Sequence, residues 1–245
     1  MTAINERERY ARQISLPGIG KAGQKKLASS SVLLVGVGGL GSPAAFYLAA
    51  AGVANIGLMD PDAVETSNLQ RQILHFTPDV GRKKVTSAKD KLELLNPGVN
   101  IMVYPDKLTI KNASRVLRGY DFIIDATDNF SSKFLIADAC HALKKPYSHA
   151  GILEFSGQTM TVIPGKTACY RCVFISPPKD VKISRGPLGA VPGVVGAIQA
   201  MEAIKYLLKA GVLLTNRLLV FDALKMNFRE VAVRRNPRCP LCGRR

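Results

Sequence analysis

The chain of 245 residues is long enough for one large domain or two small ones, and its 47% hydrophobic and 21% charged residues are typical of a folded protein. This composition excludes an intrinsically disordered chain, and five cysteines are too few for a disulfide-stapled scaffold. Lys and Arg number 34 against 18 Asp and Glu, and the net charge of +16 predicts a surface that attracts anions such as nucleotides, nucleic acid, anionic lipid or an acidic protein.

The amino-terminal segments predict neither a secretory signal nor a membrane span. Residues 1–13 alternate charged and small residues and lack the apolar run of a signal peptide. Residues 27–59 contain no charged residue and are long enough to cross a bilayer, but six glycines and Pro43 interrupt them. This segment instead predicts a buried strand, a glycine-rich turn and a buried helix. We therefore expect a cytoplasmic protein whose cysteines stay reduced.

Strands and helices alternate over the first 150 residues. Short apolar runs predict strands at residues 31–36, 55–60, 100–104, 121–125 and 147–150. Helices are predicted at residues 40–51, 83–95, 112–117 and 130–143, the third with Asn112 as its N-cap. This alternation indicates βαβ units and a parallel sheet that helices cover on both faces.

The pattern changes after Gly151. The sequence predicts a strand at 158–163, a mobile loop at 176–189, a helix with one apolar face at 194–208, and an antiparallel pair of strands at 217–221 and 228–233. The predicted fold class is α/β, with a Rossmann-like, doubly wound and mostly parallel sheet that antiparallel strands continue. We expect one domain, made of a helical arm over residues 1–30, a nucleotide-binding half over 31–150 and a mixed half over 151–245.

A glycine motif follows the first predicted strand and opens a helix, which is the context that the G-x-G-x-x-G pattern requires. Its four glycines are Gly36, Gly38, Gly39 and Gly41. Glycine lets the backbone approach phosphate closely, and the helix N-terminus donates N–H groups to it. Asp60 ends the second strand, where a carboxylate can accept hydrogen bonds from ribose hydroxyls. Taken alone, this pattern favours a dinucleotide and an NAD-linked oxidoreductase.

Amides and cations beyond this motif favour a triphosphate over a nicotinamide coenzyme. Residues 68–72 read Asn-Leu-Gln-Arg-Gln, and residues 82–84 read Arg-Lys-Lys. A nicotinamide site needs far less positive charge than a triphosphate that undergoes substitution. Asp125 and Asp128 follow the fourth strand, where ligands bind in open α/β sheets. A carboxylate at that place can hold Mg²⁺ together with phosphate oxygens.

Four of the five cysteines form two C-x-x-C pairs. Cys169 and Cys172 form the first pair, and Cys239 and Cys242 form the second. In a reducing compartment two such pairs predict a four-thiolate Zn²⁺ site, and four protein ligands leave no open position, so the metal would be structural. A redox disulfide and an iron–sulfur cluster are the alternatives. We expect Cys140 and the three histidines to be structural.

Further motifs complete a set that runs through almost the whole chain. The set comprises Arg9-Tyr-Ala-Arg-Gln-Ile14, the glycine motif, Asp60-x-Asp62, Ser67-Asn-Leu-Gln-Arg-Gln72, Gly81-Arg-Lys-Lys84, Asp125-x-x-Asp128-Asn129, Cys169-Tyr-Arg-Cys172, Gln199-Ala-Met-Glu-Ala-Ile-Lys205 and Cys239-x-x-Cys242. Each motif alone is weak, but their combination and order are specific. With this set the chain resembles the MoeB/ThiF/HesA family, the bacterial relatives of ubiquitin-activating enzymes.

The resemblance implies ATP-dependent adenylation of the C-terminal carboxylate of a small ubiquitin-like sulfur-carrier protein that ends in Gly-Gly, with release of pyrophosphate. It also implies a homodimer, Mg²⁺ in the active site, a structural Zn²⁺, and a carrier-binding surface within residues 151–245. A carboxylate is a weak nucleophile and must attack an anionic nucleotide. We therefore expect catalysis through positioning and through cations.

By motif position the resemblance also assigns roles to single residues. Arg71 and Lys84 face the phosphates, Asp128 holds Mg²⁺, and Arg12 reaches the phosphates from the other subunit. The nucleotide-binding residues that it implies are Gly36, Gly38, Gly39, Gly41, Asp60, Asp62, Asn68, Gln72 and Asn129. The motifs fit carriers of the molybdopterin-synthase and thiamine types equally well.

One departure from the family pattern concerns sulfur chemistry. Many members carry a cysteine in the loop before the helix that contains Gly-Val-Val-Gly, but residues 179–186 have none. We therefore expect adenylation without a covalent thioester step, and a separate sulfur donor.

Three other functions stay open at this point. The positive charge suits an adenylating enzyme of the same superfamily that modifies tRNA, although the two cysteine pairs resemble the carrier-activating branch, so we do not expect a nucleic-acid partner. An NAD-dependent oxidoreductase is the second alternative. A degenerate nucleotide-binding scaffold is the third, and the intact set of cations and carboxylates argues against it.

Overall fold

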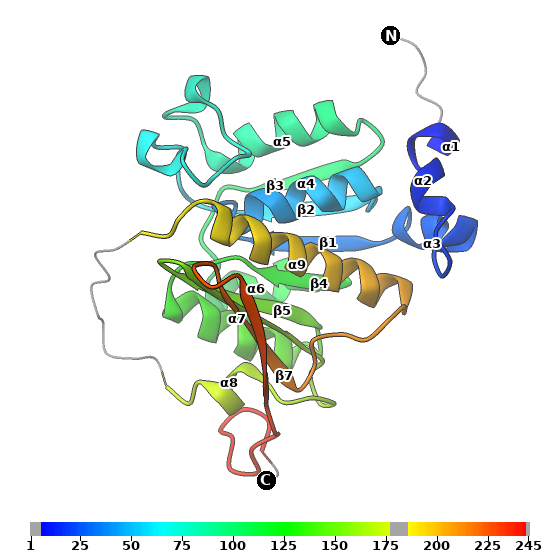
Figure 1. Ribbon diagram of the computed structural model, residues 1–245. Helices are drawn as coiled ribbons and strands as arrows, with labels where there is room; N and C mark the ends of the chain where they lie inside the picture. Colours follow the sequence, from blue (N-terminus) through cyan, green and yellow to red (C-terminus); the bar gives the residue numbers. More distant parts are fainter. Residues whose placement is uncertain (1–5, 177–185, 244–245) are drawn as a thin grey trace.

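The computed structural model describes residues 6–176 and 186–243. One eight-stranded sheet forms its centre, with the strands in the order β3-β2-β1-β4-β5-β6-β7-β8 (Figure 1). The strands are β1 (Ser31–Val35), β2 (Asn55–Met59), β3 (Asn100–Tyr104), β4 (Phe122–Asp125), β5 (Tyr147–Leu153), β6 (Ser156–Val162), β7 (Arg217–Asp222) and β8 (Asn227–Ala232). Strands β3, β2, β1, β4 and β5 pair in parallel, and β6, β7 and β8 continue the sheet antiparallel. The predicted fold class is therefore confirmed.

Helices cover both faces of the sheet. The helices are α1 (Glu6–Arg9), α2 (Ala11–Ile14), α3 (Gly20–Leu27), α4 (Gly41–Ala51), α5 (Lys84–Leu95), α6 (Ile110–Leu117), α7 (Phe130–Ala142), α8 (Tyr170–Val173) and α9 (Ala190–Leu208). Buried residues of α4, α5 and α9 pack together in one hydrophobic core, and those of α6, α7 and α8 pack in a second core on the opposite face. Both cores exist because parallel strands are apolar on both sides.

Two helices begin earlier in the chain than the sequence predicts. The prediction of Asn112 as the N-cap of α6 is wrong, because Thr109 is the N-cap. Asn112 lies in the first turn, where its Oδ1 accepts the Thr109 N–H at 2.8 Å. Helix α9 begins at Ala190 and includes Pro192 in its first turn, where a residue without an N–H costs no hydrogen bond. Most of the predicted mobile loop at 176–189 lies outside the described residues.

The two segments that are long and apolar enough to span a membrane, residues 27–59 and helix α9, contribute instead to the hydrophobic core around the sheet. Residues 27–59 form β1, the glycine turn, α4 and β2, as predicted. Helix α9 has the length and hydropathy of a membrane span, but half of that apolar window is buried inside the molecule. It packs against α4, β5 and β6, so its buried apolar residues have partners within the fold.

The contact between α9 and α4 generates a stability prediction. A Cβ atom at Gly196 would lie 2.3 Å from the Leu40 carbonyl oxygen, so the two helices can approach this closely only with glycine there. We expect Gly196→Ala to lower the free energy of unfolding by about 1–3 kcal/mol, measured by urea denaturation. Gly193→Ala in the same helix is the matched control, because a Cβ there meets nothing within 4 Å. The control should be neutral or stabilising by up to about 1 kcal/mol, and equal losses in both variants would contradict close packing as the cause.

Candidate active site

A cavity of about 900 Å³ opens at the carboxyl ends of the parallel strands. It lies where the strand order changes direction between β1 and β4, the place at which open α/β sheets bind ligands. The structure brings most of the sequence-predicted site residues to its wall. These residues are Gly36, Gly38, Gly39, Asp60, Asp62, Arg71, Gln72, Lys84, Asp128 and Asn129.

The glycine turn at the base of the cavity leaves no room for side chains. Gly36 has φ +99°, and a Cβ atom there would lie 2.5 Å from the Ala126 carbonyl oxygen of the turn after β4. A Cβ at Gly41 would lie 2.1 Å from the Gly36 carbonyl oxygen. Gly41 does not line the cavity. It serves the close approach of α4 to the turn, which brings the N-terminus of that helix to the cavity.

Two side chains hold the Val37 peptide groups in the middle of this turn. The Asp60 Oδ2 accepts the Val37 N–H at 2.8 Å, and its Oδ1 accepts the Asp62 N–H at 3.0 Å. On the other side, the His75 Nε2 lies 3.0 Å from the Val37 carbonyl oxygen. Burial raises the pKa of Asp60, while the Lys84 ammonium and the two backbone hydrogen bonds act against that rise. Asp60 therefore fixes the turn in addition to lining the cavity.

The cations of the site differ in how firmly they are held. Lys84, the first residue of α5, is buried, and its Nζ lies 2.9 Å from the exposed Asp62 carboxylate. Arg71 lines the cavity beside Gly39 and donates to the Ser67 carbonyl oxygen at 3.1 Å. The partner of Lys84 is exposed and the Ser67 carbonyl is neutral, so an anion in the cavity can compete with either partner for its cation.

The two predicted amides of the segment at 68–72 occupy different places. Asn68 is buried, and its Oδ1 accepts the Glu65 N–H at 3.3 Å, so it shapes its own turn and does not line the cavity. Gln72 lines the cavity beside Gly38, and its buried Oε1 has no hydrogen-bond partner among the residues that the structure describes. A buried acceptor without a partner is available to a ligand donor.

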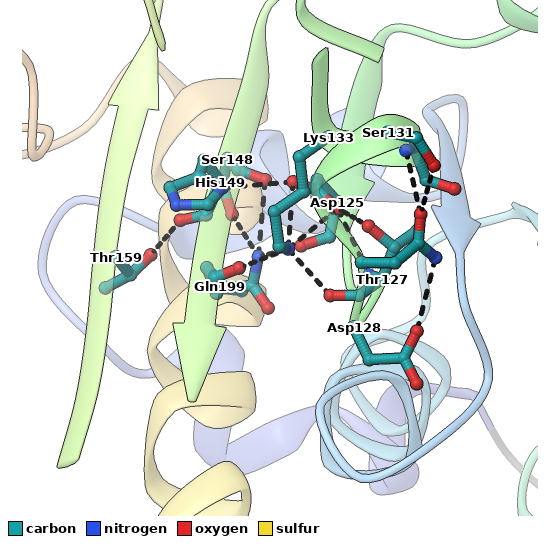
Figure 2. Close-up of polar contacts among 12 residues, drawn as sticks. Asp125, Thr127, Asp128, Ser131, Lys133, Ser148, His149, Thr159 and Gln199 are labelled. Carbon is teal, nitrogen blue, oxygen red and sulfur yellow. Dashed lines mark hydrogen bonds and ion pairs between the residues drawn. The ribbon is translucent and has the colours of Figure 1, made fainter. Parts of the chain in front are cut away.

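An exposed carboxylate faces the cavity from the turn after β4. Among the residues that the structure describes, Asp128 forms no ion pair, and its Oδ1 accepts a hydrogen bond of 3.3 Å from Asn129 Nδ2 (Figure 2). Asn129 is the N-cap of α7, with its Oδ1 accepting the Ser132 N–H at 2.9 Å. Asp128 thus presents an exposed carboxylate of the kind that a hard cation binds together with phosphate oxygens.

Behind Asp128 lies a buried charge network centred on Asp125 (Figure 2). The Asp125 carboxylate lies 3.3 Å from Lys133 Nζ and 3.0 Å from His149 Nδ1. Burial would raise the pKa of Asp125, but the Lys133 ammonium and the His149 hydrogen bond outweigh burial and hold the pKa at about 2. Burial lowers the pKa of His149, so this ring is neutral and donates its Nδ1–H to the ionised Asp125.

Sequence analysis did not identify Lys133 and His149 as residues of the site, although both line the cavity. Lys133 lies on the buried side of α7 with Phe134, Ala137 and Cys140. A lysine on an otherwise apolar helix face requires a buried counter-charge, and this signal was present in the sequence. His149 carried no comparable signal, because its partner Asp125 belongs to the neighbouring strand.

Arg12 is the predicted catalytic residue that lies away from the cavity of its own chain. It is exposed on α2, and Figure 1 shows α2 beside α3, which leads into the amino end of β1. The cavity lies at the opposite end of the strands. Arg12 can therefore act at a nucleotide site only in another copy of the chain.

The four predicted metal ligands come together at the carboxyl end of the chain. The sulfur atoms of Cys169, Cys172, Cys239 and Cys242 all lie within 4.8 Å of one another. The Sγ atoms of Cys169 and Cys239 are 3.5 Å apart, and those of Cys172 and Cys242 are 3.4 Å apart. Thiolates arranged tetrahedrally around Zn²⁺ at about 2.3 Å would be separated by about 3.8 Å, so the donor set and its size fit zinc.

Comparisons with known proteins agree with this geometry. A sequence model of the ThiF family matches residues 10–241. The sulfur carrier protein adenylyltransferase of Thermus thermophilus is 45% identical, over 97% of this chain and 91% of its own length. Adenylyltransferase and sulfurtransferase MOCS3 of Drosophila sechellia is also 45% identical, over 96% of this chain, but the chain spans only 53% of that protein.

A solved structure extends the comparison to three dimensions. The crystal structure of Escherichia coli MccB with ATP superposes with a TM-score of 0.84 at 25% identity, over 96% of this chain and 75% of that one. The family match over almost the whole chain and the identity of 45% together show that this protein belongs to the ThiF family and is an adenylyltransferase.

Proposed function

We propose that this adenylyltransferase uses ATP to activate the C-terminal carboxylate of a small ubiquitin-like sulfur-carrier protein that ends in Gly-Gly. The products are an acyl-adenylate and pyrophosphate. The observation that carries the proposal is a cavity that has the glycine turn at its base and gathers Arg71, Lys84 and the exposed carboxylate of Asp128. The name of the Thermus thermophilus relative supports the same substrate class. Membership in the ThiF family also favours adenylyl transfer over the NAD-linked alternative.

The cavity residues suit an attack of one anion on another. The carrier carboxylate forms a bond to the α-phosphorus of ATP, and the bond from that phosphorus to pyrophosphate breaks. Arg71 and Lys84 neutralise the phosphates, with Lys84 exchanging its bond to Asp62 for one to the nucleotide. The N-terminus of α4 and the glycine turn receive phosphate oxygens. Catalysis of this kind needs fixed positive charge where negative charge grows on the leaving group.

Asp128 holds Mg²⁺ in this proposal. When bound, Mg²⁺ neutralises phosphate charge and orients the triphosphate. The exposed carboxylate of Asp128 supplies a ligand of the required type, and the hydrogen bond from Asn129 limits how it turns. Asp60 and Gln72 offer acceptors to the nucleoside, the latter through its buried Oε1.

A homodimer completes the site in this proposal. Arg12 is exposed on α2 and lies away from its own cavity, which supports a role in the cavity of the other subunit. An arginine supplied across an interface adds a cation to the phosphates only when the dimer forms. The positively charged surface steers an acidic carrier toward the dimer.

Zinc and sulfur have separate parts in the proposal. Zn²⁺ bound to the four clustered cysteines ties the end of the chain to α8. Cys140 is fully buried, and burial raises its pKa, so it is unsuited to thioester chemistry. Sulfur therefore comes from a separate donor, in the cytoplasm, after adenylation. The chain covers about half of MOCS3, so the sulfurtransferase part of that name is not carried over.

The direct test is ATP–pyrophosphate exchange with a panel of purified carriers that end in Gly-Gly. We expect exchange with a cognate carrier and none with tRNA or with a carrier that lacks the last glycine. Gels run without reductant should show no covalent adduct between the carrier and this chain. Exchange that depends on tRNA instead would favour the tRNA-modifying alternative, and a dithiothreitol-sensitive adduct would contradict the absence of a thioester step.

Substitution of Arg71 tests the role of the cations. We expect Arg71→Ala to slow exchange about a hundredfold or more, because a cation of the transition state is lost. Arg82→Ala is the matched control, since Arg82 pairs with Asp79 and Asp90 outside the cavity. This variant should retain near wild-type exchange.

Mixing Arg71→Ala with Arg12→Ala chains should restore part of the rate, because hybrid dimers contain one intact site. No recovery in a mixture shown to exchange subunits would contradict the contribution of Arg12 across the dimer.

Metal analysis tests the cysteine cluster. The wild-type protein should contain about one zinc ion per chain, and Cys172→Ser should lose it because only three ligands remain. Removing zinc with a chelator should lower the midpoint of thermal unfolding, since binding to the folded state is itself folding free energy. Cys140→Ala is the control and should keep its zinc, because Cys140 lies outside the cluster. Full zinc content in Cys172→Ser would rule out the four-cysteine site.

A further inference from the structure

Lys133 is a buried cation behind the turn that carries Asp128. It lies in the first turn of α7 and is 6% exposed. Although it lines the nucleotide cavity, it was not among the cations that the sequence motifs single out. A buried ammonium is stable only when each of its N–H groups has a partner, so its partners show what it does.

The partners of Lys133 use all of its donors. Its Nζ donates to the Thr127 carbonyl oxygen at 2.6 Å and to the Ala150 carbonyl oxygen at 2.5 Å. It also lies 3.3 Å from each carboxylate oxygen of Asp125. An ammonium has three N–H groups, and these three partners occupy them. Lys133 therefore has no donor left for a phosphate, in contrast to Arg71.

The two carbonyl groups that Lys133 joins belong to different strand ends. Thr127 immediately precedes Asp128 in the turn after β4, whereas Ala150 belongs to β5. Figure 2 shows Lys133 reaching from α7 to Asp125 and to the turn that carries Thr127 and Asp128. A single side chain thus ties the peptide before Asp128 to the neighbouring strand.

The remaining contacts fix the same turn at its two ends. At the strand end, Gln199 Nε2 of α9 donates to the Asp125 carbonyl oxygen at 3.0 Å, from the opposite face of the sheet. At the helix end, Asn129 caps α7. Between these points, Lys133 holds the Thr127 carbonyl oxygen. With this contact the backbone on both sides of Asp128 is fixed, and its carboxylate points to the cavity before any ligand arrives.

We propose that Lys133 is a positioning residue that fixes the Asp128 carboxylate for the metal–nucleotide complex by clamping the Thr127 carbonyl to the end of β5. This inference rests on the proposed function, because that proposal gives Asp128 its metal. Groups that orient a metal ligand from behind typically change metal affinity about 10–100-fold when they are removed. Loss of Lys133 should therefore weaken metal binding and leave metal-free nucleotide binding unchanged.

The informative variant removes both buried charges. Lys133→Met alone leaves Asp125 buried without its cation, which threatens the fold. The double variant Asp125→Asn with Lys133→Met restores charge balance with side chains of similar size, but leaves the Thr127 carbonyl without its clamp. Asp125→Asn alone is the matched control, because it keeps the Lys133 contacts to Thr127 and Ala150. It also leaves that ammonium without its counter-charge, so the thermal scan must first show that this variant is folded. Lys133→Arg is the conservative variant that keeps both charge and donors.

The measurement is Mn²⁺ binding to the ATP complex, followed by electron paramagnetic resonance, beside ATP binding without metal and a thermal unfolding scan. We expect the double variant to need about tenfold more Mn²⁺ for half-saturation, with metal-free ATP affinity unchanged. Asp125→Asn and Lys133→Arg should stay near the wild-type value. In the exchange assay the double variant should show the same rise in half-saturating Mg²⁺, and added metal should restore its rate.

Three outcomes would overturn the inference. These are wild-type Mn²⁺ binding in the double variant, an equal loss of metal-free ATP binding, and failure of the double variant to fold. The second would make Lys133 a phosphate ligand, and the third would make it a residue that serves only the fold.

Failure of the proposed function would give different results. Normal Mn²⁺ binding in Asp128→Ala would remove the metal assignment itself, and a wild-type protein that binds Mn²⁺ with ATP yet exchanges no pyrophosphate would refute only the reaction.

Discussion

The turns after β1 and β4 touch each other with no side chain between them, and the rest of the site depends on this contact. At Gly36 a Cβ atom would come within 2.5 Å of the Ala126 carbonyl oxygen, and at Gly41 within 2.1 Å of the Gly36 carbonyl oxygen. Because the turns meet, the N-terminus of α4 and the carboxylate of Asp128 face the same cavity. Asp60 and Lys133 then hold the two turns from outside, each through a backbone group.

The charges around the cavity fall into two classes with different tasks. Asp125 and Lys133 are both buried and neutralise each other, so they remain paired whatever occupies the cavity. Lys84 instead shares the exposed carboxylate of Asp62, and an anionic ligand competes with that carboxylate for it. Arg71 donates to a neutral carbonyl group and is the readiest to bind a phosphate. The site thus combines a buried ion pair with cations whose present partners a ligand can replace.

Sequence reasoning recovered the elements with strong local signals and missed contacts that form between strands. The glycine turn could be predicted because the G-x-G-x-x-G motif between a strand and a helix is typical of a phosphate-binding turn. The metal site could be predicted because two C-x-x-C pairs have the spacing of metal ligands. The apolar spacing from Val194 onward predicts a later start for α9 than the observed Ala190, because the first turn, with Pro192, adds little to that pattern. His149 could not be assigned a partner, because its contact with Asp125 exists only once β4 and β5 pair.

The eight strands form a single sheet, and β5 belongs to both of its parts. It pairs in parallel with β4 on one side and antiparallel with β6 on the other, so hydrogen bonds run without a break from the parallel part of the sheet into the antiparallel part. A continuous sheet has no hinge at this junction, so the two parts cannot close around a substrate by bending relative to each other. Any opening for product release would then fall to the connections at the strand ends.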